Sequence, residues 1–593
     1  MTLTQRSKRL VAALRRLQSP AQDPFTAGLV AAAVGLVVGY AALGFRQGIA
    51  FVQLHGFGTA ADDMIVHARA LSWYVVLLTP VAGGFVVAAM LRLFLHGKAP
   101  HSVAEVIQAN MVSAGRIRLR DGAASAVVAM TALGSGASVG REGPIVHLGA
   151  TLAAFLAQRL KAPPAMARTL LGCGVAAAIA ASFNAPLAGV FFALEVVLGS
   201  YAISAFAPIV IAGVMGTIVT RIHVGDYPAF SIPDYALVSF WEVPAFLLLG
   251  GVSALVAVAF MKAIFFADTQ LARLPLPRWT NPPLAGLAVG VLALGLPELL
   301  GVGYGATDAA LKQAYPLFLL LALLAGKLVA SALCLAARYG SGVFSPSLFL
   351  GAMTGGAFGM AAAMLFPTLA ASHGLYAIVG MGAVAGAVLG APISTVLIVF
   401  ELTGDYQVTL ALMAATATAS VISARFFETS FFHLQLKRRG LAVDGGRARL
   451  ALRQRRVDSA MDEEFLIVPE DATLARVRAL LARLTRGALI VVRQGGTFIG
   501  VIRPRDMSED VTDASLDSLV RAADIARPVK SLVLASDSLD AALSLMTASG
   551  EDMLPVLDSL ESRRVKGVVH KADVVMAFNA LLLEAEREIQ GHV

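Results

Sequence analysis

Residues 134–144 read Gly134-Ser135-Gly136-Ala137-Ser138-Val139-Gly140-Arg141-Glu142-Gly143-Pro144. Apolar segments flank this stretch on both sides, yet it contains a cation, a carboxylate and several glycines. Irregular backbone survives at membrane depth only where it is buried in protein or lines a cavity. An ionisable residue at that depth indicates a functional site. The stretch therefore predicts a broken membrane helix with a polar site at the break.

The residues of this break favour an anion. Pro144 suits the first turn of a helix over residues 145–160, because a proline needs no amide donor there. The free amides of Arg141, Glu142 and Gly143 would lie at the positive end of that helix. Glu142 is itself an anion, so its carboxylate competes with a mobile ion, and protonation would change the competition. The alternative is a packing turn in which Arg141 and Glu142 pair with each other, and spacing alone does not separate the two.

The sequence gives little support for an enzyme. A phosphate-binding loop would continue with Gly-Lys-Ser or Gly-Lys-Thr, and the stretch does not. A serine hydrolase elbow would need His and Asp partners, and none stands out. Cys173 and Cys334 both lie in apolar surroundings, which favours buried packing residues over a disulfide or a metal site. We therefore expect no catalytic residues, no metal and no enzyme activity.

The composition is that of a membrane protein. The chain has 593 residues, of which 57% are hydrophobic and 15% charged. A soluble protein would carry about 25% charged residues. Long apolar runs recur, for example at 28–44, 74–90 and 317–335, and each has the character of a membrane segment. The segments are uneven in length and rich in glycine and proline, which is typical of tilted and interrupted helices.

Basic residues gather at the two ends of the apolar region. Arginine and lysine precede the first apolar run within residues 1–23, and more follow the last run within residues 433–456. By the positive-inside rule we expect both termini in the cytoplasm and an even number of crossings. The net charge of +8 is then explained by membrane topology, so we expect no nucleic-acid partner. Lys327, inside an apolar run, is expected to extend toward a membrane interface.

The sequence divides into four parts. Residues 1–23 are a cytoplasmic N-terminal segment, 24–432 a transmembrane domain, 433–456 a basic linker and 457–593 a soluble α/β domain. The membrane part contains a repeat: the Ala-Pro turn and apolar helix that end at Glu195 are echoed by those that end at Glu401. Two such copies suggest two structural halves with the site between them. Both glutamates are expected to be structural, accepting helix or loop amides.

The soluble part also contains two copies of one unit. The first runs from a strand at 466–468 through a helix from Thr473 to strands at 488–492 and 500–502. The second runs from a strand at 532–534 through a helix from Ser538 to strands at 553–556 and 567–569. The pattern resembles a pair of CBS domains.

The resemblance to a CBS pair suggests a ligand. Asp506 and Asp573 match the positions at which CBS pairs hold a nucleotide ribose, which implies an adenine nucleotide as a possible cofactor. The serine or threonine expected three residues earlier is Arg503 in one copy and His570 in the other. A purely structural module that stabilises a dimer is the alternative.

Three membrane motifs together resemble the CLC chloride channel and transporter family. Residues 140–144 resemble its GREGP motif, and residues 340–346 resemble its GGxFxP turn, with Ser341 in place of a glycine. Residues 183–195 resemble its NAPLAG-to-Glu helix. The likeness covers nearly the whole chain in the right order. It implies a polytopic α-helical membrane protein with inverted halves and eighteen helices per subunit. It also implies a homodimer with one pore in each subunit, in the lipid bilayer of a bacterial plasma (inner) membrane.

By the same resemblance, the anion path is built from helix ends. The amides of Arg141, Glu142 and Gly143 would serve an outer site, and those of Val343 and Phe344 a central site. Amides suit a mobile ion, because partial charges bind a halide without trapping it. Glu142 would be the gate.

The chain departs from the family pattern at three positions. The usual inner Gly-Ser-Gly-Ile-Pro turn is replaced at residues 100–104, so that His101 stands where the serine hydroxyl would be and Ser102 follows it. The pore tyrosine aligns with Phe432, which has no hydroxyl. The internal proton-handling glutamate of the exchangers aligns with Val196, which cannot carry a proton.

These departures bear on mechanism. We interpret the chain as a passive, voltage- or pH-gated chloride channel, favoured by Val196 and by the missing hydroxyl at Phe432. The alternative is a chloride/proton antiporter of the same family, in which water or another residue replaces the internal glutamate. A cation transporter would need a ring of pore carboxylates, of which the membrane part offers few.

Overall fold

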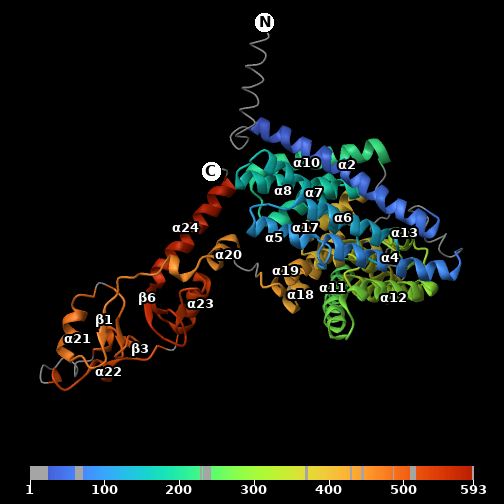
Figure 1. Cartoon of the computed structure of the whole chain (residues 1–593). Helices are drawn as coiled ribbons and strands as arrows, with labels where there is room; N and C mark the ends of the chain where they lie inside the picture. Colours follow the sequence, from blue (N-terminus) through green and yellow to red (C-terminus); the bar gives the residue numbers. More distant parts are fainter. Residues whose placement is uncertain are drawn as a thin grey trace, which may run out of the picture. The chain divides into compact units, whose positions relative to one another are not determined.

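The computed structural model describes residues 24–59, 71–226, 230, 242–366, 372–427, 430–441, 446–484, 486–507, 516–529 and 531–590. The expected N-terminal segment, 1–23, lies outside the described residues. The chain forms two compact units, Met1–Leu441 and Ala442–Val593. In the described residues the first unit is helical and the second contains the strands (Figure 1). Eight described helices are long and apolar enough to cross a membrane.

The first half of the membrane unit is a run of helices of very different lengths. The longest, α2, packs against α6, α7, α8 and α10. Short helices such as α5 and α9 could not span a bilayer alone, as expected for interrupted helices. The elements are α2 (Pro24–Phe57), α4 (Trp73–Phe94), α5 (Val103–Val112), α6 (Leu119–Gly134), α7 (Glu142–Arg159), α8 (Pro164–Phe183), α9 (Pro186–Phe192), the π turn η3 (Ala193–Leu198) and α10 (Ile203–Val224).

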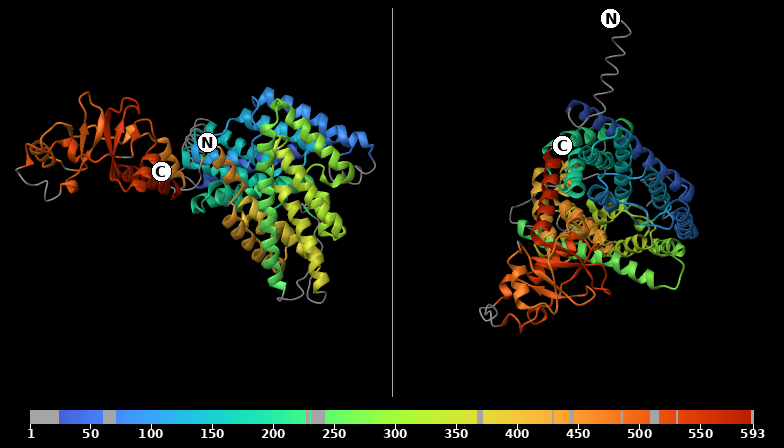
Figure 2. Two further views of the ribbon diagram at one scale, coloured as in Figure 1. Left: turned by 90° about the horizontal axis from the view of Figure 1, so that it is seen from below. Right: turned by 60° about the vertical axis from the view of Figure 1, so that its left-hand side comes forward.

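The second half continues the pattern (Figure 2). Its helix α19 runs past Phe432, so the predicted end of the membrane part at 432 falls inside a helix. Ser430 caps that helix by accepting a hydrogen bond from the amide of His433 at 3.1 Å. The elements are α11 (Val243–Arg273), η5 (Arg278–Thr280), α12 (Asn281–Gly295), η6 (Pro297–Leu299), α13 (Tyr304–Leu311), α14 (Leu317–Ala336), α15 (Phe344–Leu365), α16 (His373–Leu389), α17 (Pro392–Thr403), α18 (Tyr406–Phe426) and α19 (Phe431–Arg438).

The succession α6 to α10 is repeated as α14 to α18. Pro144 and Pro346 are both the third residue of their helices, α7 and α15. The helices α8 and α16 both end at a residue in the left-handed conformation, and Pro186 and Pro392 both begin the helix that follows. The repeat expected from the Ala-Pro turns therefore extends over five helices.

The two copies cap each other reciprocally. The carboxylate of Glu195 accepts hydrogen bonds from the amides of Ile393 at 3.0 Å and Ser394 at 2.8 Å. The carboxylate of Glu401 accepts from the amides of Leu187 at 2.9 Å and Ala188 at 2.8 Å. Each carboxylate satisfies first-turn amides of the helix in the other copy, where the helix dipole favours a negative charge. The structural role expected for both glutamates is confirmed.

The second unit is a small α/β domain built from two equal halves. Each half has a three-stranded sheet in which the first strand pairs parallel to the second and the second antiparallel to the third. Val568 of one sheet packs with Ile490 and Phe498 of the other in one hydrophobic core. The elements are α20 (Gly446–Gln454), η7 (Val457–Ser459), β1 (Ile467–Pro469), α21 (Leu474–Leu481), β2 (Leu489–Val492), β3 (Phe498–Ile502), η8 (Pro504–Asp506), α22 (Ala522–Ile525), β4 (Val533–Leu534), α23 (Leu539–Ser549), β5 (Met553–Leu557), β6 (Val565–His570) and α24 (Lys571–Gln590).

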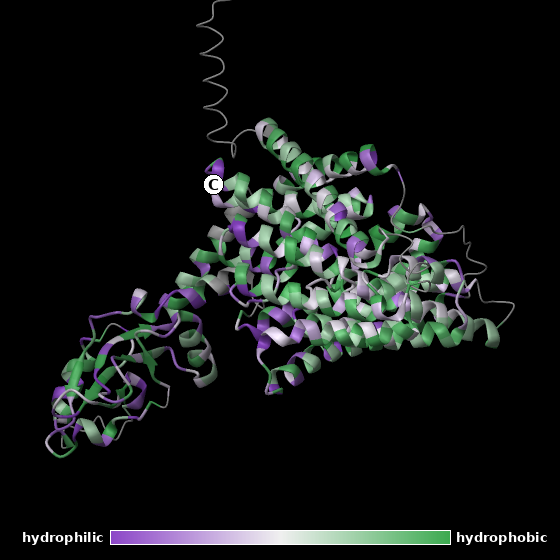
Figure 3. Ribbon diagram, turned by 45° about the vertical axis from the view of Figure 1, so that its right-hand side comes forward, coloured by the Kyte–Doolittle hydropathy of each residue, from purple (hydrophilic) through white to green (hydrophobic). Residues whose placement is uncertain are grey.

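Hydropathy separates the two units. Apolar residues cover most of the helices of the membrane unit, whereas the second unit has apolar strands under polar loops (Figure 3). Large apolar side chains are exposed on the membrane unit, including Phe85, Leu248 and Phe318. Such exposure is expected where the solvent is lipid. Cys173 and Cys334 are both free and buried, as expected.

Candidate functional site

The site lies where α7 and α15 begin. The amide of Gly140 donates to the carbonyl oxygen of Gly342 at 2.8 Å, and the two residues form an antiparallel bridge. A side chain at Gly342 would bring a Cβ within 2.0 Å of the Gly140 carbonyl oxygen, so glycine is required there. The two broken-helix turns, distant in the sequence, are thereby joined, and the first-turn amides of both helices are gathered at one place.

Glu142 occupies this place. Its side chain is fully buried, and its Oε2 accepts a hydrogen bond from the Ser345 amide at 3.2 Å and another from the Ser345 hydroxyl. The Tyr304 hydroxyl donates to its Oε1 at 2.5 Å. A carboxylate therefore sits on an amide of the first turn of α15. The N-terminus of a helix favours an anion at this position.

Arg141 lies beside the carboxylate rather than in a close ion pair with it. Its Nε is 3.8 Å from Glu142 Oε1, and its guanidinium stacks over the Tyr304 ring at 4.5 Å from the centroid. One of its Nη atoms donates to the Ser182 carbonyl oxygen at 3.4 Å. The simple Arg141–Glu142 pair considered from the sequence is therefore only a part of the arrangement.

Tyr304 is positioned by a buried lysine. Lys327 is fully buried, and its Nζ donates to the carbonyl oxygens of Gly301 at 2.9 Å and Leu299 at 3.4 Å. Both carbonyls belong to the turn that leads into α13, whose first residue is Tyr304. The expectation that Lys327 extends to a membrane interface is wrong. Packing of α14 against this turn gives its ammonium group carbonyl partners inside the protein.

The inner turn differs from the sequence alignment. Ser102, the residue before α5, is buried, and a Cβ on Gly143 would lie 2.3 Å from its Oγ. Among the described residues this hydroxyl has no hydrogen-bond partner. His101 instead points its ring at His147 of α7, with ring centroids 5.0 Å apart. The hydroxyl next to the α7 amides thus comes from Ser102, whereas His101 occupies the aligned position.

Aromatic side chains pack together at the start of α15. Phe344, the first residue of α15, packs against Phe183 at 5.2 Å and Phe192 at 5.8 Å between ring centroids.

Phe432, aligned with the family's tyrosine, is buried in the first turn of α19. Val196 lies in the π turn η3, one residue after Glu195. Among the described residues no cluster of His, Cys, Asp or Glu could hold a metal.

The two CBS aspartates are both ion-paired. Asp506 lies 2.9 Å from Arg527, and it also accepts from the Arg503 amide at 3.1 Å. Asp573 lies 3.1 Å from Arg486. A ribose would therefore have to replace an arginine at each carboxylate, and nucleotide binding at these positions stays a prediction.

Sequence reasoning missed three residues of the site. Ser345 lies inside the second motif, and its hydroxyl could have been noted there. His147 lies one helical turn after Gly143, which is a usable signal once Gly143 is placed at a helix start. Tyr304 carries no signal, because 162 residues separate it from Glu142.

Converging broken helices with a carboxylate at their shared start define a polytopic membrane protein of the ion-transporting class. The sequence model of the family described as "Voltage gated chloride channel" matches residues 83–424. That match spans more than half of the chain, and the chain therefore belongs to the voltage gated chloride channel (CLC) family, whose members transport anions. The CBS domain model matches residues 457–512.

Individual relatives agree with this assignment. A ClcB-like chloride channel protein of Ralstonia nicotianae is 33% identical over 397 residues, which are 66% of this chain and 92% of that protein. The H(+)/Cl(-) exchange transporter ClcA of Cronobacter sakazakii is 30% identical over 429 residues, 71% of this chain and 91% of that protein. The crystal structure of a eukaryotic CLC transporter superposes with a TM-score of 0.62 at 18% identity, over 95% of this chain and 98% of that one. This last likeness shows the fold.

Proposed function

We propose that the protein is a chloride/proton exchanger in which Glu142 is the exchanging carboxylate. The observation that carries the proposal is the position of this side chain. It is fully buried and accepts a hydrogen bond from a first-turn amide of α15 at 3.2 Å. The carboxylate thus occupies a place in which a small anion would be held in the same way.

The chemistry of the Glu142 site couples chloride binding to proton binding. A charged carboxylate at a helix N-terminus gains charge-assisted hydrogen bonds, and protonation removes most of that gain. Once neutral, Glu142 no longer holds the Ser345 amide, and chloride takes its place at the amides that begin α7 and α15. When Glu142 returns as a carboxylate it releases the proton and displaces the anion. One carboxyl group therefore alternates between proton and chloride.

The relatives support exchange more than passive conduction. One of them, at 30% identity over most of its length, is named an exchange transporter. The passive channel favoured by Val196 and Phe432 remains the alternative, and it requires chloride to move without protons. Ser102 supplies the inner hydroxyl in this proposal. The proposal also includes a homodimer in a bacterial plasma membrane, which the family resemblance implies. It places both termini in the cytoplasm, which the basic ends of the membrane part support.

The test is the purified full chain in liposomes, with chloride and pH electrodes read together. We expect an outward chloride gradient to drive protons inward. Glu142→Gln should reduce proton flux at least tenfold while chloride flux continues and loses its dependence on external pH. Asp308→Asn, a carboxylate-to-amide change in a surface ion pair with Lys312, is the control. A wild-type reversal potential that does not shift with pH would instead establish the passive channel.

A further inference from the structure

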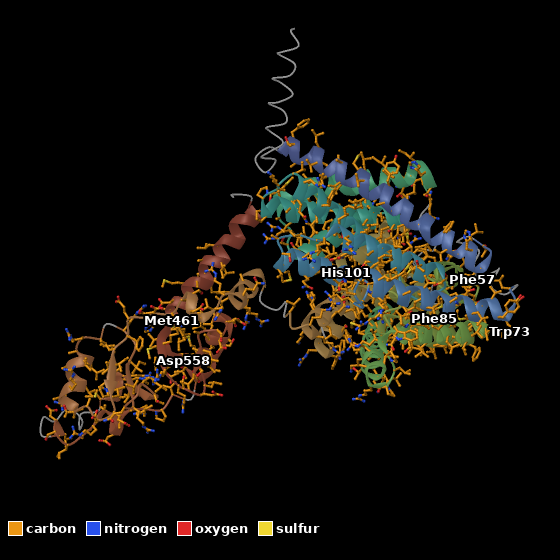
Figure 4. The ribbon with its side chains drawn as sticks, viewed as in Figure 1. Phe57, Trp73, Phe85, His101, Met461 and Asp558 are labelled. Atoms are coloured by element: carbon orange, nitrogen blue, oxygen red, sulfur yellow. The ribbon has the colours of Figure 1, made fainter. Side chains whose placement is uncertain are left out.

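A buried histidine and a partly buried one meet beside the anion site. The rings of His101 and His147 lie 5.0 Å apart between centroids at an interplanar angle of 66°. His147 is 1% exposed, and the Nδ1 atoms of both rings are buried without a hydrogen-bond partner among the described residues. Buried polar nitrogens are usually satisfied, so such a pair calls for a functional explanation. Figure 4 labels His101 among the helices of the membrane unit.

His101 is held in place from two sides. Its amide donates to the Ser125 hydroxyl of α6 at 3.0 Å. Its carbonyl oxygen accepts from the Ser341 hydroxyl at 3.1 Å. Ser341 is the residue that replaces a family glycine in the turn before α15, so this unusual serine ties that turn to His101. The ring is therefore presented to His147 by a fixed backbone.

His147 and the Glu142 gate belong to the same helix, α7. His147 is four residues after Gly143, which places both on one face of the helix. It is five residues after Glu142, a separation of about 7.5 Å along the helix axis. The Ser102 hydroxyl faces Gly143 on the same side. The histidine pair and the Ser102 hydroxyl therefore lie on the Gly143 side of the start of α7.

The pair also has a connection to the protein surface. Glu105 and His101 are the ionisable groups in the described residues whose charges act on His147. Glu105 accepts from Arg439 at 2.6 Å, and their side chains are 16% and 36% exposed, respectively. It also accepts from the Ser102 amide at 2.7 Å. The ion pair thus extends from the protein surface to the start of α5, next to the two histidines.

We propose that the His101–His147 pair is the internal proton station of the exchanger, in the role that the family resemblance assigns to position 196. Imidazole suits this role, because one of its ring nitrogens can accept a proton while the other donates one. The Nδ1 atom of His147 takes a proton from a hydronium ion that arrives on the Glu105 side, and a water molecule is left behind. The imidazolium then releases the proton toward Glu142, whose carboxylate takes it up and becomes a neutral acid, and the imidazole is neutral again. The inference rests on the proposed exchange function.

The test measures the number of protons moved per chloride in liposomes. We expect His147→Asn to lower this ratio at least tenfold, and His101→Asn to lower it less. His223→Asn, at a histidine of α10 whose ring contacts Tyr40, is the matched control. Adding Val196→Glu to His147→Asn should restore proton movement, because a carboxylate then stands at the family position. Such rescue separates a lost proton station from a lost fold.

The outcomes are distinct. A wild-type ratio in His147→Asn overturns the inference and leaves the exchange function standing. Parallel loss of proton and chloride flux in both His147→Asn and His147→Gln assigns the histidine a packing role and also overturns it. A wild-type protein that moves no protons ends both proposals.

Discussion

At the residue scale, the gate is defined by what holds Glu142. The amide of Ser345 could donate to any small anion. The hydroxyls of Tyr304 and Ser345 donate to the Glu142 carboxylate only when that side chain is in this position. Arg141 lies over the Tyr304 ring and adds positive charge without a short ion pair. These contacts stabilise the closed position of the side chain. Their strength sets how often the site is released to chloride.

Tyr304→Phe should raise the rate of chloride transport. The change removes the hydroxyl that donates to Glu142 at 2.5 Å and keeps the ring under Arg141. A hydrogen bond to a charged group contributes about 1.5–3 kcal/mol, so the occluded position should be weakened by that order. Initial chloride efflux from liposomes is the measurement, and we expect an increase of about tenfold or more. Tyr406→Phe, at an exposed tyrosine, is the control. Slower efflux in Tyr304→Phe would show that the Tyr304 hydroxyl does not hold Glu142 in the closed position.

At the element scale, the reciprocal caps join the two repeats. Each carboxylate offers two oxygens to two adjacent amides, and the two amides belong to the helix of the other copy. Glu195 also accepts from the Ser394 hydroxyl. The caps therefore fix α9 and α17, the shortest helices of the repeat, to each other.

Glu195→Gln and Glu401→Gln should each lower stability. A glutamine presents an NH2 group to one of the two amides, which leaves a donor without an acceptor at a cost of about 1–3 kcal/mol. Glu195→Gln should cost more, because its carboxylate also serves the Ser394 hydroxyl. Thermal unfolding of the protein in detergent is the measurement, with Asp308→Asn as a surface control. Equal stability of all three variants would mean that the caps contribute nothing.

At the scale of the whole molecule, the two units are stabilised differently. Small residues let the membrane helices approach closely: a Cβ on Gly351 would lie 2.3 Å from the Gly380 carbonyl oxygen. The second unit uses apolar cores and ion pairs at its surface, as a protein in water does. Asp540 is the clearest of these ion pairs, since it accepts from Arg449 and Arg453 at 2.8 Å each.

The second unit should lose stability in acid. Burial works against a charged Asp540, but hydrogen bonds from Arg453 and Arg449 outweigh it and lower the pKa of this carboxyl. A lowered pKa stabilises the fold fully above the ordinary value of about 4, and the gain is lost as pH falls through the folded value. The measurement is hydrogen exchange of α23 in the full chain, corrected for intrinsic rates.

Asp540→Asn supplies the comparison for this prediction. It should lower protection at pH 7 by about 1–2 kcal/mol, a figure reduced because both arginines are partly exposed. As the pH falls below the ordinary aspartate value toward the lowered folded-state pKa, the variant and the wild type should converge. A difference that does not change with pH over this range would point to packing rather than charge.

Much of this architecture could be predicted from local sequence. The glycines and the proline of residues 140–144 predicted a helix start, and α7 begins at Glu142 with Pro144 in its first turn. The alternation of strands and helices after residue 465 predicted both CBS-like sheets to within a few residues. These predictions hold because backbone conformation is decided by residues that are neighbours in the chain.

What the sequence determined by itself is the set of broken helices, the buried carboxylate at one break and the family. The tertiary structure alone decided which side chains meet there. It put the Tyr304 hydroxyl on Glu142, buried Lys327 on the carbonyls before α13 and turned His101 toward His147. The physical reason is that a buried polar group takes its partner from whichever distant segment packs against it. That choice depends on the folded chain as a whole and leaves no mark in the neighbouring residues.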